Sequence, residues 1–344
     1  MKKLNGYFSL LAFLFTAAIL FSFSAPALAQ DDGARAYWKG RAGTHAVSFQ
    51  YLPMFMDAEG SKAFAPGQYI YPNSNIEAHV LMATYGYHFT LPWVKRPSVI
   101  AVNVVGGSIG VDADATTLPL GFTPPGFTAA FSQSSAGFGD PSTQLTVNLF
   151  GTPPLKSNVD LFNYEPTWTV DLAALLAFPI GAYKGNKLVN MGLNRWYGRL
   201  ALPFKYHFGV FAPGRMSSFE VMPSVWLFEE NDNFLGQKLE NDPLWSVEAH
   251  LTHDFTPTFY GSLDLLYQNG FQSELNGNDV GEKLEIGSIG FTLNFQVSDN
   301  AGIRTSFNSN VFGDDNLKTA VLRLQFIYHW NAASENTKRL TGEH

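Results

Sequence analysis

Four residues in one stretch of the chain carry side chains that hydrolases use. Glu248, His250, Thr252 and Asp254 supply carboxylate, imidazole and hydroxyl groups at intervals of two residues. In a β-strand this spacing puts all four on one face, but alternate residues lie roughly 6.6 Å apart. A nucleophile and its base instead share a hydrogen bond of about 2.6 to 3.2 Å. We therefore expect a wall of ordinary polar residues and no enzyme, and a hydrolase that uses His250 is the least favoured alternative.

Other reactive groups are scarce. His250 and His253 would share a face on a helix, but they lie on opposite faces of a strand, so a shared metal ion is not expected. The chain has no Cys, which excludes thiolate chemistry and a disulfide scaffold. It contains no P-loop, the glycine-rich motif that cradles nucleotide phosphates. The sequence predicts no cofactor and no metal.

The composition is unusual for a water-soluble protein. Only 15% of the 344 residues are charged, whereas 46% are hydrophobic and 15% aromatic. Soluble domains average about 25% charged residues, and the aromatic content excludes a disordered chain. The net charge of −7 also argues against a nucleic-acid partner, because phosphate binding requires clustered Lys and Arg.

The N-terminus has the order of a secretory signal peptide. A basic start at Lys2 and Lys3 precedes an apolar run over residues 8–23, and a small-x-small cleavage site ends at Ala29. A transmembrane anchor is the alternative, but it needs about 20 apolar residues. We predict a signal peptide over residues 1–29. The next segment, 30–42, is expected in the periplasm, and the sequence leaves open whether it plugs a bore.

After residue 42 the chain alternates apolar and polar residues with a period of two. In the clearest segment, Ile289 and Phe291 share one face while Ser288 and Thr292 share the other, which is typical of a strand with one apolar face. Strands of about 9 to 11 residues can cross a bilayer, and barrels in outer membranes have even strand numbers. We expect about twelve strands, near residues 43–52, 76–91, 98–111, 140–150, 167–179, 197–209, 218–228, 243–255, 258–269, 286–297, 301–312 and 317–331.

The predicted fold class is therefore all-β, a transmembrane antiparallel up-and-down β-barrel over residues 43–331 with a polar tail at 332–344. Most connections alternate between short periplasmic turns and long external loops, as such barrels require. The exceptions are a long turn at 151–166 and a short loop at 313–316. A soluble β-sandwich is the rival, but its strands would average about five or six residues.

The seven tryptophans support a barrel that contacts lipid. Indole rings prefer the boundary between headgroups and hydrocarbon, so they form girdles at both rims of a membrane barrel. All seven fall near predicted strand ends: Trp38, Trp93, Trp168 and Trp330 at the periplasmic side, and Trp196, Trp226 and Trp245 at the external side.

Three glycine-containing motifs resemble a known family. They are Gly137-Phe138-Gly139-Asp140, Pro179-Ile180-Gly181-Ala182-Tyr183 and Asn190-Met191-Gly192-Leu193-Asn194. Together they look like the meta-pathway phenol-degradation family of outer-membrane proteins, although Ile180 stands where that family usually has Thr. The resemblance runs from about residue 43 to 331. It implies an outer-membrane barrel, often described as a transporter and linked to aromatic catabolism, with no catalytic residues to carry over.

The polar faces of the predicted strands define the lumen wall. Charges of both signs occur there, so strong selection for ions of one sign is not expected. Phe122, Phe127 and Phe131, in an external loop at 112–139, are candidates for the entry of an apolar solute. The candidate lumen residues are Asp171, Arg199, Lys205, Glu220, Glu248, His250, Asp264, Arg304, Arg323, Gln325 and His329.

The sequence thus favours an outer-membrane channel for the uptake of small hydrophobic or aromatic compounds. A structural or adhesive barrel without transport is the second hypothesis. The expected partners are outer-membrane lipid and lipopolysaccharide, the solute, and the barrel-assembly machinery, because Tyr328-His329-Trp330 resembles the aromatic end that this machinery recognises.

Overall fold

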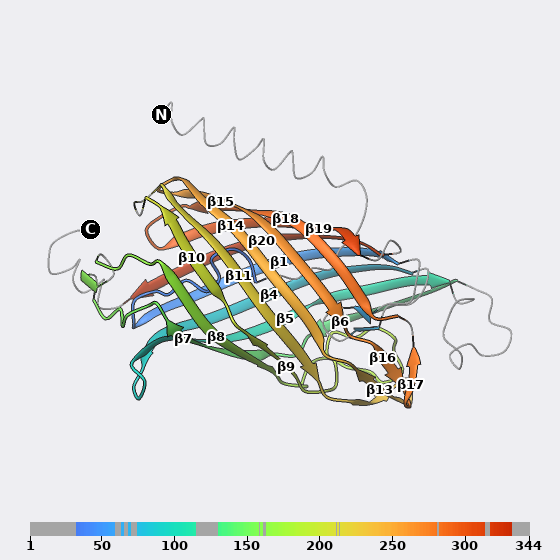
Figure 1. The fold of residues 1–344 in the computed structure, drawn as a ribbon. Helices are drawn as coiled ribbons and strands as arrows, with labels where there is room; N and C mark the ends of the chain where they lie inside the picture. The colour runs from blue at the N-terminus through green and yellow to red at the C-terminus, as the bar shows by residue number, and fades with distance from the viewer. Residues whose placement is uncertain are drawn as a thin grey trace.

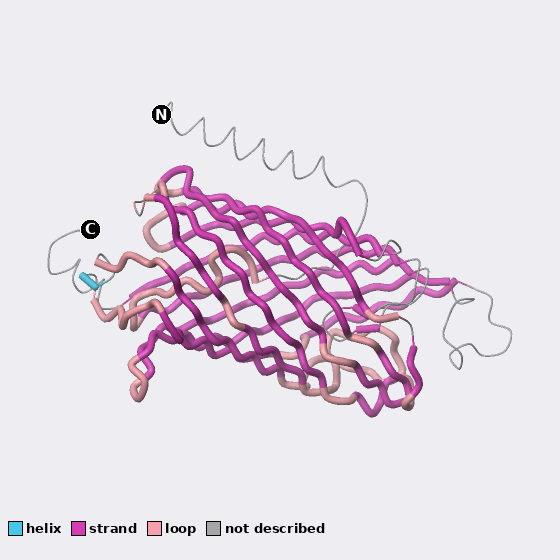
Figure 2. The backbone as a smooth tube through the Cα atoms, in the orientation of Figure 1, coloured by secondary structure: helices cyan, strands magenta, loops and turns pink. Residues whose placement is uncertain are grey.

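Twelve long antiparallel strands form one closed barrel (Figures 1 and 2). The computed structural model describes residues 32–58, 63–64, 68–69, 74–114, 130–157, 159–160, 163–210, 212, 214–280, 282–313 and 317–331. Two of the twelve strands are each broken into two pieces. The strands are β1 (Thr44–Ala58), β4 (Ser74–Leu91), β5 (Arg96–Asp114), β6 (Ala130–Phe138) with β7 (Ser142–Phe150), β8 (Trp168–Ala177), β9 (Tyr197–Ala201) with β10 (Phe204–Gly209), β11 (Met216–Phe228), β14 (Leu244–Thr256), β15 (Phe259–Gly270), β18 (Leu284–Gln296), β19 (Ala301–Gly313) and β20 (Leu317–Asn331).

The barrel closes where the first strand meets the last. β1 pairs with β20 from Thr44 opposite Asn331 to Ala58 opposite Leu317, so neither strand presents an open edge along this seam. Because the barrel is closed, the backbone N–H and C=O groups of its strands find partners on neighbouring strands, which lipid could not supply. The prediction of an antiparallel transmembrane barrel of twelve strands is confirmed.

The two ends of the barrel differ in their connections. The turns at the end holding Thr44 and Asn331, here the short-turn end, are mostly brief, and the opposite long-loop end carries small extra strands (Figure 1). The predicted exceptions, the long turn after β7 and the short connection after β19, occur in the structure. The extra strands are β2 (Ala63–Phe64), β3 (Gln68–Tyr69), β12 (Asn231–Phe234), β13 (Gln237–Asn241), β16 (Ser273–Leu275) and β17 (Asn278–Val280).

The outer surface of the barrel is apolar. On β14, Val247 and Leu251 are 40% and 48% exposed, whereas Glu248 and Thr252 between and beside them are buried. The same alternation gives exposed Leu263 on β15 and the other outward aliphatic and aromatic side chains. The barrel therefore presents an apolar belt that suits acyl chains. Within the described part of the chain, no helix is long and apolar enough to cross a membrane.

The interior at the long-loop end is also apolar, which the sequence interpretation did not foresee. Inward side chains from six strands pack there against residues of the loops, and they form a cluster that we call the apolar cap. Its buried members are Leu52, Met54, Met56, Ile76, Ala78, Ile109, Val111, Val189, Phe234, Leu239, Leu244, Phe271, Leu275, Leu284, Ile286, Leu317 and Val321.

The three motifs that suggested a family meet where β6 gives way to β7. The Asp140 carboxylate accepts hydrogen bonds from the backbone N–H of Gly181 at 2.8 Å and of Leu193 at 2.7 Å. A Cβ on Gly181 would lie 2.6 Å from the carbonyl carbon of Gly139, so only glycine permits this close approach. The motifs thus fix the backbone between the end of β6 and the start of β7.

Several element boundaries differ from the expectation. The strand expected at 140–150 begins ten residues earlier, as β6, and is interrupted near Pro141. The strand expected at 197–209 is broken between β9 and β10 at Pro203, which has no N–H for the ladder. Two tryptophans near predicted strand ends point inward and do not join a girdle: Trp38 lies inside the barrel against Glu220, and Trp226, near the end of β11, lines an internal cavity.

Gly151, at the turn after β7, provides a test of the backbone. It has a φ of +92°, and an added Cβ would lie 1.8 Å from the carbonyl oxygen of Trp168. We expect Gly151→Ala to lower the free energy of unfolding in detergent by at least about 1 to 3 kcal/mol. Gly236→Ala is the control, because Gly236 has a φ of +75° but no described heavy atom within 4 Å of the new Cβ. Equal losses in the two variants would refute the clash.

Candidate functional site

The segment that precedes β1 was expected in the periplasm, but in the structure it lies inside the barrel. We call residues 32–42 the N-terminal plug. Its backbone N–H groups reach the wall: that of Asp32 donates to Glu248 at 2.9 Å, and that of Arg35 donates to Glu220 at 3.0 Å. Ala34 and Tyr37 are 0% and 8% exposed. The structure thus answers the question of whether this segment enters the bore.

Arg35 anchors the plug to β14. Its guanidinium pairs with Asp254 at 2.6 Å and donates to the Thr252 hydroxyl from two nitrogens, at 3.1 and 3.0 Å. It also stacks between two rings, with its central carbon 4.4 Å from the centroid of Trp38 and 4.1 Å from that of Tyr260. A buried guanidinium with both ionic and cation–π contacts fixes the orientation of the plug.

Asp32 forms a second anchor, on Arg199 of β9. Its carboxylate pairs with Arg199 at 2.5 Å and accepts a hydrogen bond from the Tyr37 hydroxyl. Burial alone would raise the pKa of Asp32, but the Arg199 guanidinium, together with Tyr37 and Arg323, holds the pKa below its ordinary value. Arg199 also donates to Gln144 at 3.2 Å, so this anchor reaches across β7 and β9.

A third anchor is a buried carboxylate between two lysines. Asp171 on β8, 0% exposed, pairs with Lys205 at 2.5 Å and with Lys39 of the plug at 3.3 Å. The Lys205 ammonium also donates to the backbone oxygen of Tyr37 at 2.6 Å. Burial, opposed by Asp171, lowers the pKa of Lys39 to about 8. Lys39 therefore remains mainly charged at neutral pH.

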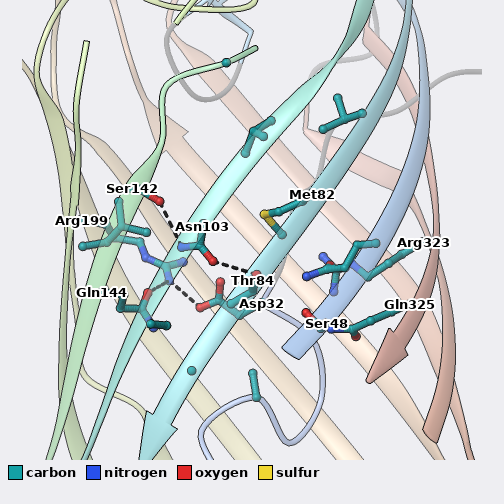
Figure 3. Close-up of a pocket in the computed structure, with 18 of the residues that line it drawn as sticks. Asp32, Ser48, Met82, Thr84, Asn103, Ser142, Gln144, Arg199, Arg323 and Gln325 are labelled. Atoms are coloured by element: carbon teal, nitrogen blue, oxygen red, sulfur yellow. Dashed lines mark hydrogen bonds and ion pairs between the residues drawn. The ribbon is translucent and has the colours of Figure 1, made fainter. Parts of the chain in front are cut away.

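A cavity of about 540 Å³ lies next to the plug and extends to the apolar cap. Its floor contains Asp32 and Arg199, and part of its wall is a polar ladder in which Thr84 donates to Asn103 at 2.8 Å and Asn103 donates to Ser142 at 3.1 Å (Figure 3). Toward the apolar cap the wall becomes aliphatic. The apolar residues that face this part of the cavity are Met54, Ala78, Val80, Met82, Val105, Ile109, Met191 and Leu193.

The eleven candidate lumen residues lie on the inner side of the wall. Arg304, Arg323 and Gln325 line the cavity together with Arg199, and Gln325 is half-buried. His329 is also half-buried, near His88 at the short-turn end. Their role in a pore remains a prediction. Six candidates are gathered around the plug, namely Asp171, Arg199, Lys205, Glu220, Glu248 and His250, and Asp264 contacts the last of these.

The hydrolase-like residues belong to this wall network. His250 lies between two carboxylates, with its Nδ1 2.8 Å from Asp264 and its Nε2 3.6 Å from Glu248. The Thr252 hydroxyl is engaged by Arg35 and by Ser218, the latter at 2.7 Å. These contacts hold the plug and the wall together, and the expectation that the protein is not an enzyme remains a prediction.

Two further sequence features bear on chemistry. Gly106-Gly107-Ser108-Ile109-Gly110 matches the Gly-x-Ser-x-Gly pattern of hydrolases, but it lies inside β5 rather than on a strand-to-helix turn. Within the described ranges, no group of three or more His, Asp or Glu side chains could hold a metal ion. Of the loop candidates, Phe122 and Phe127 lie outside the described residues, and Phe131 is placed only by its backbone in β6.

Comparisons with known proteins agree with this architecture. A sequence family described as "Putative MetA-pathway of phenol degradation" matches residues 65–326. The crystal structure of an outer membrane channel from Pseudomonas putida F1 aligns with a TM-score of 0.67 at 13% identity, over 87% of this chain and 100% of that one. At this identity the likeness shows the fold. No curated protein matches.

Two other solved structures align less well. The transport unit of the autotransporter AIDA-I from Escherichia coli has a TM-score of 0.45 at 7% identity, over 89% of this chain and 93% of that one. A mutant of the monoaromatic hydrocarbon channel TodX has a TM-score of 0.34 at 8% identity, over 90% of this chain and 96% of that one. Neither similarity is close enough to carry an argument.

Proposed function

This chain belongs to the MetA-pathway phenol-degradation family, and from that premise we propose that it is an outer-membrane channel for the uptake of small hydrophobic or aromatic compounds. The observation that carries the proposal is the internal cavity of about 540 Å³, aliphatic toward the long-loop end and polar toward the plug. Ligand pockets typically enclose about 300 to 1,000 Å³ and combine apolar walls with a few placed polar groups.

The route through the barrel supports this assignment. A hydrated ion would lose its water shell in the apolar cap, whereas an apolar solute would not, so the cap favours uncharged or amphipathic solutes. The polar ladder of Thr84, Asn103 and Ser142 then offers hydrogen bonds to a hydroxyl on such a solute. Passage beyond the cavity requires the plug to move.

A structural or adhesive barrel is the second candidate. The observation that favours it is the plug itself, since ion pairs at Asp32, Arg35 and Lys39 hold it inside the lumen. Uptake measurements separate the two functions. In either case we expect the barrel to contact outer-membrane lipid and lipopolysaccharide, and the assembly machinery to read the aromatic end of β20.

The uptake hypothesis predicts that blocking the cavity abolishes transport. Ala101 on β5 faces the cavity, so Ala101→Trp places a bicyclic ring in the proposed route. We expect the initial uptake of radiolabelled phenol at low concentration, in a porin-depleted Gram-negative host, to fall to that of cells without the protein. Ala249→Trp is the matched control, because Ala249 lies between Val247 and Leu251 on the same outward face of β14. Wild-type uptake no faster than that of the empty host would exclude the channel function.

A further inference from the structure

The inner wall formed by β9 and β11 presents aromatic rings to the cavity. Tyr197 and Trp226 both line the cavity, and their ring centroids are 6.5 Å apart. Trp226 shares the inward face of β11 with the buried Met222 and Ser224, and it is itself only half-buried. Because the residue faces inward, the exposed part of its ring lies in the lumen. One side of the cavity therefore has an aromatic surface.

This aromatic surface continues toward the long-loop end. The ring of Tyr197 stacks on that of Phe228, with centroids 6.1 Å apart and an interplanar angle of 23°. The Phe228 ring in turn meets Phe271 of the apolar cap edge-on, at 4.8 Å and 72°. Aromatic pairs prefer such offset or edge-to-face arrangements at centroid distances of about 4.5 to 7 Å. A row of rings thus runs from the apolar cap to Trp226 in the cavity.

The Trp226 ring at the cavity end of this row is fixed by its neighbours. The central carbon of the Arg199 guanidinium lies over the ring, 5.0 Å from its centroid, and the same guanidinium pairs with Asp32 of the plug. Trp226 also packs against the apolar cap. A ring that is already ordered loses little conformational entropy when a solute binds to it, which favours binding.

The side of the barrel opposite Trp226 carries methionines. Five strands separate β1 from β11 in each direction around the barrel, counting each broken strand once, so Met54 of β1 and Trp226 lie on opposite sides of the cavity that both line. Met82 of β4 and Met191 also line it, and Figure 3 shows Met82 at the pocket. A thioether makes favourable contacts with an aromatic ring, often at the ring edge. Both sides of the cavity thus favour an aromatic occupant.

We propose that Trp226 and Tyr197 form a binding face for an aromatic ring, and that this face makes the cavity select aromatic compounds over saturated compounds of the same ring size and polarity. The inference rests on the proposed channel function and narrows its solutes to those with a planar π-system. A purely aliphatic cavity would bind by burial of apolar area alone, which does not favour a planar ring over a saturated one. Trp226 is therefore a specificity-determining residue.

The test compares benzyl alcohol with cyclohexylmethanol, which has the same hydroxymethyl group on a saturated ring of the same size. Each alcohol is titrated calorimetrically into the purified mature protein in detergent, and the titration into detergent alone is subtracted. We expect benzyl alcohol to bind about three- to tenfold more tightly, the range that an aromatic pair contributes beyond area burial. Burial alone predicts no such preference, because the saturated ring has at least as much apolar surface.

Three variants assign the preference to the ring of Trp226. Trp226→Leu should reduce the preference to within about twofold, whereas Trp226→Phe keeps an aromatic face and should retain most of it. Trp245→Leu is the matched control, because Trp245 pairs with Val225 beside Trp226 in the β11–β14 register but is outward and 61% exposed. It should leave the preference unchanged. The ratio of the two affinities is taken within each variant, and retarded gel mobility before heating reports a folded barrel.

The outcomes separate this inference from the channel function. Equal binding of the two alcohols to the wild type overturns the inference, as does failure of benzyl alcohol to bind or a full preference that survives in Trp226→Leu. In each of these cases phenol uptake, and with it the channel function, can stand. Absence of phenol uptake by the wild type, with the preference for benzyl alcohol intact, overturns the channel function alone.

Discussion

Removing residues 32–42 is expected to make the short-turn half of the lumen accessible to water-soluble reagents. Met222 on β11 is 4% exposed and packs in the interior with Tyr37 of the plug. The chain has no Cys, so Met222→Cys introduces a single thiol whose reactivity reports this one position. In the full chain we expect slow labelling by a charged thiol reagent.

In the deletion variant the ring of Tyr37 is absent, and the carboxylates that held the plug recruit water instead. A thiolate reacts only where the reagent reaches it, so labelling should accelerate by at least about tenfold. The rate is measured by mass spectrometry on the folded protein in lipid bilayers. Met222→Cys in a chain lacking the tail 332–344 controls for the effect of truncation.

Met56→Cys supplies the internal comparison for the same experiment. Met56 is 1% exposed and belongs to the apolar cap at the long-loop end, where the plug has no contact in the described structure. Its labelling rate should not change when the plug is deleted. Acceleration at both positions would mean that the barrel loosens as a whole, and no acceleration at Met222→Cys would show that the plug does not seal the lumen.

Asp171→Asn is expected to be the most destabilising single change in the interior. The substitution retains the shape of the side chain but removes the charge that lies between Lys205 and Lys39. Two buried ammonium groups would then face each other without a counter-ion, and breaking a buried pair in this way costs about 3 to 5 kcal/mol. The midpoint of urea unfolding in detergent should fall accordingly.

A surface ion pair of the same chemistry serves as the control. Lys238 pairs with Glu230 at 2.6 Å, but the two side chains are 41% and 50% exposed, so water screens them. Glu230→Gln should leave the unfolding midpoint unchanged. If Asp171→Asn had as little effect as Glu230→Gln, the anchor between the plug and β8 would have no role in stability.

The barrel was predictable because lipid contact imposes a strict pattern on the outward side chains. On β14 every second residue had to be apolar, and the polar residues between, such as Glu248 and His250, had to face inward. The same argument located the eleven candidate lumen residues on the correct side of the wall. The same argument predicted twelve strands. Pro141 and Pro203 each divide one strand into two pieces, but both pieces stay in the barrel wall, so the count does not change.

The plug was not predictable from the same pattern. Residues 32–42 have no periodicity, and their charges, as in Asp32 and Arg35, are typical of a solvated segment. Only the three-dimensional structure shows that partners such as Glu220 and Asp254 lie within reach. The apolar cap was missed for a related reason. On β4 the inward face is the apolar one, with Ile76, Ala78, Val80 and Met82, whereas Glu77 and His79 lie on the other face. Alternation alone led us to expect every apolar face to point outward.

The seam between the first and last strands has a consequence for biogenesis. Thr44 and Asn331 meet across 287 residues of sequence, so the cylinder cannot close until the ribosome has released nearly the whole chain. Such a distant contact is slow to form, because the loop-closure entropy must be overcome before the contact stabilises anything. The plug, residues 32–42, must enter the bore before β1 pairs with β20. An affinity tag fused to the N-terminus of the plug would therefore be carried into the bore. A tag placed after Asn331 leaves the plug free to be captured normally.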